Sequence, residues 1–243
     1  MTAEGDWADP ALTDWWQREF TGGVDPEYTE QILPLIAAEL RGFGHVLDIG
    51  TGEGQVARVL AADGARVTGV DPFPGQVTEA SRRGGNVRYV LAEAAGLPFA
   101  DDGFDAAVAC LVFEHIDDVD GAISEVARTV RPGGRFVFLL NHPLLQTPNS
   151  GWIDDQIIDP PEQYWRIGPY LTETATIEEV QKNVFVRFIH RPLSRYLNAL
   201  ADSGLVLEHM HEPAPPASFL AQSPQYADAA TVPRLLALRL RRT

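Results

Sequence analysis

The sequence predicts an α/β protein in which a seven-stranded, mostly parallel sheet carries helices on both faces. Short apolar segments alternate with amphipathic segments from residue 45 onward, and the alternation resumes after a proline-rich stretch that begins near residue 141. Apolar strands that alternate with helices are typical of a parallel sheet buried on both sides. The length of 243 residues fits one domain that contains an insertion.

The first 41 residues are expected to form a helical segment ahead of the sheet. Residues 11–20 form a predicted short helix that Gly22 and Gly23 end, and Pro26 opens a second predicted helix over residues 27–40. Apolar residues recur at helical spacing in the second helix, at Ile32, Leu35, Ile36 and Leu40.

The alternating region supplies the expected strands and helices. The strands are predicted at residues 45–49, 66–70, 87–90, 105–109, 135–140, 205–211 and 232–240, which makes seven in all. Helices are predicted between them at residues 54–62, 76–83, 121–130 and 192–202. The third of these helices should end at Arg131-Pro132-Gly133-Gly134, because proline and glycine interrupt helices.

Residues 141–188 interrupt the alternation of strands and helices. They hold five prolines and several aromatic residues among acidic ones, namely Trp152, Tyr164, Trp165 and Tyr170. A connection of this length within a compact domain is usually functional or disordered, and the aromatic content argues against disorder. We expect an inserted cap that, together with Trp15, Trp16 and Tyr28, covers an acceptor pocket.

The charge balance excludes some classes of partner. Nineteen Lys and Arg residues stand against 34 Asp and Glu residues, which gives a formal charge of −15. A nucleic-acid-binding protein needs a basic face to neutralise phosphates. The densest basic run, at Arg239, Arg241 and Arg242, fits an exposed strand end. We therefore expect neither a nucleic-acid partner nor an anionic membrane surface.

Targeting signals and cysteine chemistry are also not expected. Residues 1–10 are acidic and lack the pattern of a secretory signal, and no apolar run approaches the roughly 20 residues that span a bilayer. The single cysteine, Cys110, excludes a disulfide framework and a cysteine-rich zinc site. We expect a cytoplasmic protein.

The most informative motif is the glycine-rich run Val46-Leu47-Asp48-Ile49-Gly50-Thr51-Gly52-Glu53-Gly54. It leads from an apolar strand into a helix, where the absence of side chains lets the backbone turn tightly and approach a ligand. The exposed amides at a helix start favour a negative group. Taken alone, the run is also compatible with an ordinary strand-to-helix turn.

Asp71 ends the next predicted strand, 23 residues after Asp48. A carboxylate at this point can accept hydrogen bonds from both hydroxyls of a ribose. The glycine spacing is G-x-G-x-G rather than the G-x-G-x-x-G of dinucleotide sites, and the turn contains no Lys or Arg to meet phosphates. A nicotinamide oxidoreductase is therefore disfavoured, and a cationic nucleoside is favoured.

With these motifs the chain resembles the class I S-adenosylmethionine-dependent methyltransferases, which have a Rossmann-like sheet. Within that family it looks like the small-molecule branch that resembles the ubiquinone and menaquinone methyltransferases. Three further motifs contribute: Glu93-Ala94-Ala95-Gly96-Leu97-Pro98-Phe99, the run Leu111-Val112-Phe113-Glu114-His115-Ile116, and the turn at residues 131–134. The resemblance covers residues 27–140, and residues 188–240 more loosely.

The resemblance implies S-adenosylmethionine as cofactor, S-adenosylhomocysteine as product and no metal. It implies that Asp71 holds the ribose, Pro72 and Phe73 contact the adenine, and Glu93 accepts from the adenine amino group, where Asp is commoner in the family. The implied cofactor-binding residues are Asp48, Gly50, Thr51, Gly52, Asp71, Pro72, Phe73, Glu93, Ala94, Cys110 and Leu111. We expect Cys110 to be a small packing residue rather than a nucleophile.

Methyl transfer from a sulfonium is an in-line displacement, and it needs a general base only when the acceptor must lose a proton. His142 and His115 follow predicted strands at the edge where ligands of such sheets bind, and they are the candidate catalytic residues. His142 is alternatively a hinge residue bonded to the backbone, and His115 is alternatively a loop residue. His209 and His211 share a strand face but have no third ligand for a metal.

The sequence thus predicts one methyltransferase domain over residues 1–243. It comprises a helical lid segment (1–41), a cofactor-binding core (42–140), a cap insertion (141–188) and a C-terminal segment that completes the sheet (189–243). We expect a small-molecule acceptor that is apolar or aromatic and carries a hydroxyl group. A non-catalytic protein that binds S-adenosylmethionine or S-adenosylhomocysteine is the alternative, and a homodimer is left open.

Overall fold

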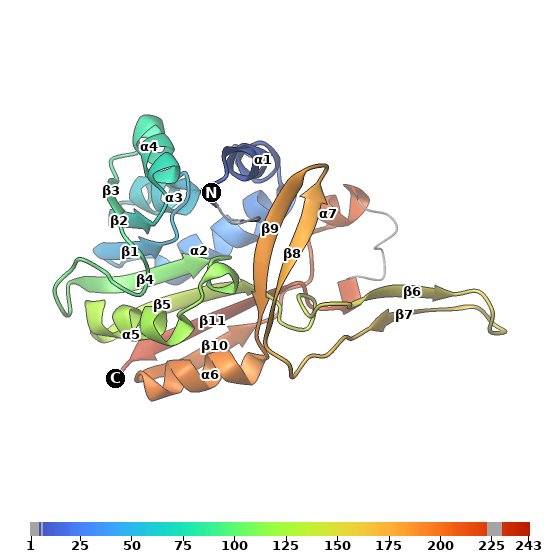
Figure 1. Ribbon diagram of the computed structural model, residues 1–243. Helices are drawn as coiled ribbons and strands as arrows, with labels where there is room; N and C mark the ends of the chain where they lie inside the picture. Colours follow the sequence, from blue (N-terminus) through green and yellow to red (C-terminus); the bar gives the residue numbers. More distant parts are fainter. Residues whose placement is uncertain (1–4, 6, 223–229) are drawn as a thin grey trace.

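The computed structural model describes residue 5 and residues 7–222 and 230–243. Seven strands form one sheet in the order β10-β11-β5-β4-β1-β2-β3 (Figure 1). All neighbouring strands are parallel except for β11, which runs antiparallel to β5 and β10. The strands of this sheet are β1 (His45–Ile49), β2 (Arg66–Asp71), β3 (Arg88–Leu91), β4 (Phe104–Cys110), β5 (Val130–Asn141), β10 (Leu205–His211) and β11 (Leu235–Arg242). The predicted seven-stranded, mostly parallel sheet is confirmed.

Helices cover both faces of the sheet, as the strand composition requires. Successive residues of a strand point to opposite faces, and Val46 packs with helices α2 (Leu33–Leu40) and α3 (Gln55–Ala62). Its neighbour Leu47 packs with α5 (Val119–Thr129) and α6 (Leu193–Asp202) on the other face. Helix α4 (Pro74–Arg83) packs along β2 and β3.

The N-terminal segment contains the two predicted helical regions. Helix α1 (Pro10–Phe20) begins at Asp9, whose side chain accepts a hydrogen bond from the amide of Ala11 at 2.9 Å. The second region differs from the expected single α-helix, because a π-helical turn, η1 (Tyr28–Ile32), precedes α2. This turn buries Tyr28 and Ile32. π-Turns of this kind are frequent at functional sites.

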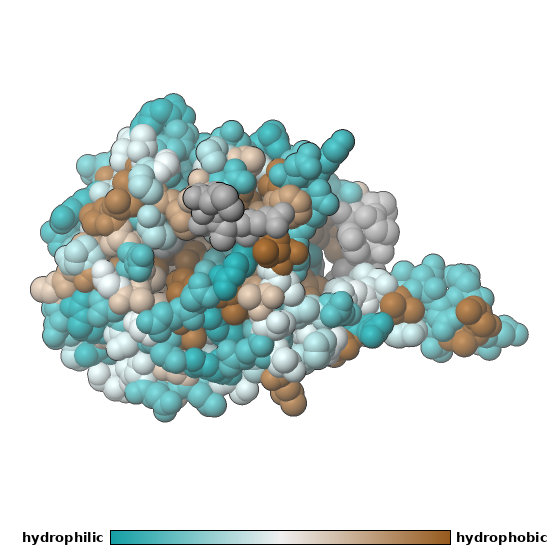
Figure 2. Space-filling view, viewed as in Figure 1, coloured by the Kyte–Doolittle hydropathy of each residue, from teal (hydrophilic) through white to brown (hydrophobic). Residues whose placement is uncertain are grey.

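The inserted stretch folds as two antiparallel hairpins, which the sequence analysis did not predict. The first joins β6 (Gly151–Asp155) to β7 (Glu162–Arg166), and the second joins β8 (Thr174–Gln181) to β9 (Val184–His190). The expected total of seven strands is therefore wrong for the chain, although it is right for the main sheet. The β6–β7 hairpin projects from the body and is mostly hydrophilic, with a few isolated apolar side chains (Figures 1 and 2).

The second hairpin, β8–β9, packs against the N-terminal segment. Strand β9 contacts α1 and the 3₁₀ turn η2 (Phe113–His115) that follows β4. The amide of Arg187 in β9 donates to the carbonyl of Gly5 at 3.2 Å. The β8–β9 hairpin thus brings a distant part of the chain to the carboxyl ends of the central strands.

The last part of the chain completes the sheet after an unpredicted short helix, α7 (Ala217–Gln222). The basic run on β11 is ion-paired, and only Arg241 in it is exposed: Arg239 and Arg241 lie within 4 Å of Glu208, and Arg242 lies 3.6 Å from Asp102. Within the described residues, no helix is long and apolar enough to cross a bilayer.

Candidate active site

A cavity of about 710 Å³ opens at the carboxyl ends of β1, β2 and β4. Strand β1 lies between β2 and β4, so the chain leaves β1 at the point where the strand order reverses, which is where ligands bind in open α/β sheets. All eleven residues predicted to bind the cofactor line this cavity, from Asp48 to Leu111. The volume suits a drug-sized ligand.

The glycine turn after β1 forms one wall of the cavity. Gly50 has φ 65° and Gly52 has φ 54°, a backbone conformation that L-residues other than glycine rarely adopt. A Cβ atom at Gly50 would clash with the Val112 side chain, whereas a Cβ atom at Gly52 would meet open space. The backbone of Gly52 is therefore bare toward the cavity, so a ligand can approach it closely.

Asp71 ends β2 as a buried carboxylate with both oxygens anchored. Oδ2 accepts from the Gly52 amide and Oδ1 accepts from the Phe73 amide, each at 3.0 Å. Burial raises the pKa of Asp71 to about 6, while the two amide donors favour the charged form. Each oxygen keeps a further acceptor site for a ligand hydroxyl.

Asp48, inside the turn, is a second buried carboxyl group. Its Oδ2 accepts from the Thr51 hydroxyl at 2.6 Å. Burial, helped by the nearby charges of Asp71 and Glu53, raises the pKa of Asp48 to about 7. Asp48 therefore fixes the shape of the turn and adds to the acidic character of the site.

Glu53 belongs to the site although sequence reasoning missed it. Its side chain is 2% exposed, and Oε2 lies 2.6 Å from Arg58 and 2.8 Å from Arg83. Glu53 lines the cavity, and its Oε1 is buried without a hydrogen-bond partner in the described structure. Of its two arginine partners only Arg58, five residues away in α3, is close enough in sequence to have been a signal.

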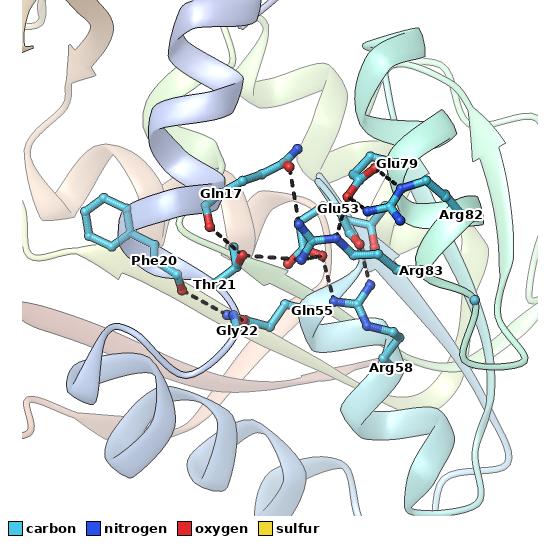
Figure 3. Close-up of polar contacts among 12 residues, drawn as sticks. Gln17, Phe20, Thr21, Gly22, Glu53, Gln55, Arg58, Glu79, Arg82 and Arg83 are labelled. Atoms are coloured by element: carbon cyan, nitrogen blue, oxygen red, sulfur yellow. Dashed lines mark hydrogen bonds and ion pairs between the residues drawn. The ribbon is translucent and has the colours of Figure 1, made fainter.

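Arg83 connects this loop to helix α1 (Figure 3). Its guanidinium donates to the Thr21 hydroxyl at 3.3 Å and to Gln17 Oε1 at 3.2 Å, while it pairs with Glu53. Gln55 adds a second link, because it donates to the Phe20 carbonyl and accepts from the Gly22 amide. The end of α1 is thereby fastened to the glycine turn.

Aromatic side chains from the N-terminal segment form another wall of the cavity. Trp7, Trp16 and Tyr28 line the cavity, with ring centroids 5.5 Å apart for Trp7–Trp16 and 6.0 Å apart for Trp16–Tyr28. The expected contribution of the inserted stretch is largely wrong. Trp152 and Trp165 pack on each other in the projecting hairpin, at 5.6 Å, and neither lines the cavity.

His115 lies in this wall, between the rings of Trp7 and Phe188 at centroid distances of 5.3 and 5.0 Å. Its Nδ1 is 2.8 Å from the carbonyl oxygen of Arg187. A carbonyl only accepts, so Nδ1 carries the proton and Nε2 has a lone pair. Burial, together with the charge of Arg187, lowers the pKa of His115 to about 4. His115 is a neutral acceptor of protons or hydrogen bonds.

Two buried groups hold the loop that carries His115. Arg191 donates to the backbone carbonyls of Phe113 and Ile116 at 3.1 and 2.7 Å. Glu114 accepts from the Asn141 side chain at 2.8 Å, and burial raises the pKa of Glu114 to about 7. The position of His115 is thus set by residues far away in sequence.

His142 follows β5 as expected, but it does not reach the cavity. It is buried outside the lining of the cavity, its Nε2 lies 2.9 Å from Glu212 Oε1, and its Nδ1 accepts from the Leu144 amide at 3.1 Å. Both ring nitrogens are engaged, so the hinge alternative fits His142 and a general base role does not. We leave His142 out of the proposed catalytic set.

Cys110 fits the packing role expected for it. The thiol is free, and burial raises its pKa well above the usual range. His209 and His211 pack edge to face at 4.1 Å. In the described part of the chain, no group of three or more His, Cys, Asp or Glu residues could hold a metal ion.

Comparison with known proteins supplies relatives for the core. A family model described as "Methyltransferase domain" matches residues 47–138. The chain is 36% identical to the O-methyltransferase resE of Aspergillus sclerotiorum over 116 residues, 44% of each protein. It is 38% identical to the demethylmenaquinone methyltransferase of Beutenbergia cavernae over 115 residues, 47% of each. The match thus spans less than half of the length of these curated relatives.

A solved structure extends the likeness to most of the chain. The S-adenosylmethionine-dependent methyltransferase of Mesorhizobium loti superposes with a TM-score of 0.73 at 28% identity, over 90% of this chain and 98% of that one. The similarity therefore includes the N-terminal segment or the insertion as well as the core.

We predict that His115 remains neutral across the physiological pH range and carries its proton on Nδ1. Burial and the hydrogen bond to the Arg187 carbonyl are the cause. Nitrogen-15 NMR of the imidazole should show this tautomer and a titration midpoint near pH 4. A midpoint near 6.5, the ordinary value, or an Nε2–H tautomer would contradict the assignment.

We also predict that Arg83→Ala loosens helix α1. The substitution removes two hydrogen bonds to α1, each of which contributes about 0.5–1.5 kcal/mol. Hydrogen exchange of the α1 amides should accelerate by roughly 5-fold to 150-fold, the equivalent of about 1–3 kcal/mol for the two bonds together. Arg82→Ala is the matched control, because Arg82 pairs with Glu79 and is exposed. Equal exchange in the two variants would show that Arg83 does not fasten the helix.

Proposed function

The chain belongs to the class I S-adenosylmethionine-dependent methyltransferases, and we propose that it transfers a methyl group to a small molecule held in the cavity. The observation that carries the proposal is the anchored Asp71 carboxylate beside the bare backbone of Gly52. Its two oxygens are available to a pair of neighbouring hydroxyls, as a ribose presents them.

The residues present fit S-adenosylmethionine. Asp71 would hold the ribose, Phe73 and Pro72 would lie against the adenine, and the amide of Ala94 would meet a ring nitrogen. Asp48 and the carbonyls near Leu111 would surround the methionine end, whose ammonium and sulfonium suit acidic surroundings. The empty space above Gly52 supports this arrangement, because a side chain there would occupy the ligand's volume.

The bound cofactor supplies an electrophilic methyl group, and the chain aligns the acceptor behind it. Alignment alone can account for much of the rate of an in-line displacement. Trp7, Trp16 and Tyr28 would exclude water and hold an apolar acceptor. His115 Nε2, with its lone pair, would accept a hydrogen bond or a proton from the acceptor.

Release of S-adenosylhomocysteine with a panel of small acceptors tests the proposed activity. The purified protein should bind S-adenosylmethionine in calorimetry and release S-adenosylhomocysteine with at least one acceptor. Binding without release across the panel would instead favour a non-catalytic binding protein. Affinity for NADH with none for S-adenosylmethionine would overturn the cofactor.

We predict that Asp71→Ala weakens S-adenosylmethionine binding by about 1.5–3 kcal/mol, because hydrogen bonds to a charged acceptor are lost. Calorimetry should then give a dissociation constant raised roughly 10- to 150-fold. Asp63→Ala is the control, since Asp63 is exposed at the end of α3, outside the cavity. Equal dissociation constants for wild type and Asp71→Ala would remove the ribose role.

Binding should also weaken on acidification. Ribose hydroxyls donate to the charged carboxylate, so the bound state favours deprotonated Asp71, whose pKa in the free protein is about 6. Affinity should therefore fall as the pH decreases below about 6, by at most about tenfold per pH unit for one proton. Asp71→Ala should flatten this part of the profile, and a flat profile in the wild type would contradict the assignment.

A further inference from the structure

The cavity is lined by acidic side chains. Six carboxyl groups contribute to its described lining: Asp48, Glu53, Asp71, Glu93, Asp117 and Asp118. Among them, only Glu53 and Asp117 pair with arginines in the described structure. The buried, unpartnered Oε1 of Glu53 adds an acceptor that nothing in the described chain satisfies. The cavity therefore favours positive or neutral ligands over anions.

Basic residues in the described lining do not offset the negative charge of these carboxyl groups. Arg187 is the only Lys or Arg among the described lining residues, and its guanidinium makes two hydrogen bonds to Asp117, at 2.6 and 3.1 Å. In a bidentate pair of this kind, the N–H groups of the guanidinium that could bind a carboxylate or phosphate ligand are already used. An anionic acceptor would therefore find no free cation in this lining.

The aromatic residues of the lining favour ligands with a flat, apolar body. The rings of Trp7, Trp16 and Tyr28 present apolar faces and edges, and His115 continues the same wall. Aromatic rings stack with flat apolar bodies and attract positive charge to their faces. This wall suits a flat aromatic acceptor.

The negative charge of the lining favours some nucleophiles of the methyl acceptor over others. Phenols, carboxylic acids and the carbon atoms of hydroquinones attack as anions, and an anion beside these carboxylates is disfavoured by like-charge repulsion. Removal of a phenolic proton would also need an effective base, whereas His115 is a weak one because burial lowers its pKa to about 4. An amine nitrogen attacks as a neutral group and needs no base beforehand.

We propose that the methyl acceptor is a neutral aromatic amine or heteroaromatic nitrogen on a flat apolar body; this inference rests on the proposed methyltransferase function. The nitrogen lone pair forms the new N–C bond while the C–S bond breaks, and its electron pair stays on sulfur. Positive charge passes from sulfur to nitrogen, near the cavity carboxylates throughout. A methylated amine nitrogen then loses a proton to solvent or to His115 Nε2, whereas a pyridine-type nitrogen has no proton to lose and keeps the positive charge. The acceptor thus differs from the hydroxylated one expected from the sequence.

A matched series of ligands tests the proposal. A naphthalene frame is prepared with an amine, a hydroxyl or a carboxylate at the same position, so that the substituent is the only heteroatom nucleophile in each ligand. Methyl transfer is followed by S-adenosylhomocysteine release, and binding is measured by calorimetry on protein saturated with S-adenosylhomocysteine. The amines should be methylated at least about tenfold faster than the matched phenols, and the carboxylates should bind at least about tenfold more weakly than the amines.

Two variants, each of which removes one negative charge from the protein, distinguish the effect of charge inside the cavity from the effect of net charge. Asp117→Asn frees Arg187, and it should raise the affinity for the carboxylate ligands by about threefold or more while changing amine affinity little. Asp120→Asn is the matched control, because Asp120 makes the same two-pronged pair with Arg195 outside the cavity. It should leave the affinity for the carboxylate ligands unchanged.

Faster methylation of a phenol or carboxylate, or equal binding of amines and carboxylates, would overturn the proposal. So would the absence of methylation of every amine by protein that binds S-adenosylmethionine. Cofactor binding is measured first, so that failure of the proposed methyltransferase function is distinguished from failure of the amine proposal. The preference for ligands by charge can still be measured on protein that does not bind the cofactor.

Discussion

The hydrogen bond between the Gly52 amide and the Asp71 carboxylate joins the turn after β1 to the end of β2. A second bond, from the Thr51 amide to the Val70 carbonyl at 2.9 Å, runs beside it. Together they hold the glycine turn against the neighbouring strand, so the bare backbone of Gly52 and the carboxylate face the same cavity. A buried carboxylate is costly unless its oxygens have donors, and the amides of Gly52 and Phe73 supply them.

The parts of the fold that the sequence predicted are those with strong local signals. The apolar run at Val46 and Leu47 and the glycines after it define a strand and a turn within ten residues, and the observed β1 has the expected bounds. The cofactor residues were predicted through a resemblance based on these contiguous motifs, and they line one cavity. Their individual roles remain proposals.

The features that the sequence did not predict depend on contacts between distant residues. Arg83 meets Gln17 and Thr21 more than 60 positions away, and Arg187 meets Asp117 at a separation of 70. No periodicity within a segment reports such pairs. His142 was misplaced for the same reason, because its partner Glu212 comes from the far end of the chain. The hairpins of the insertion were missed because prolines and acidic residues weaken the usual strand pattern.

The N-terminal segment adds aromatic side chains to the cofactor cavity, and β9 adds Arg187. Arg83 fastens α1 to the glycine turn, and Arg191 holds the loop of His115. All six carboxyl groups of the described lining come instead from residues 48–118, within the stretch that the methyltransferase family model matches. The aromatic residues Trp7, Trp16 and Tyr28 lie outside that stretch.

A crystal structure with S-adenosylhomocysteine tests the central claim most directly. We predict that the two ribose hydroxyls lie within about 3 Å of the two Asp71 oxygens, with the thioether directed toward the wall formed by Trp7, Trp16 and Tyr28. A nucleoside bound elsewhere, or ribose hydroxyls that do not contact Asp71, would contradict it.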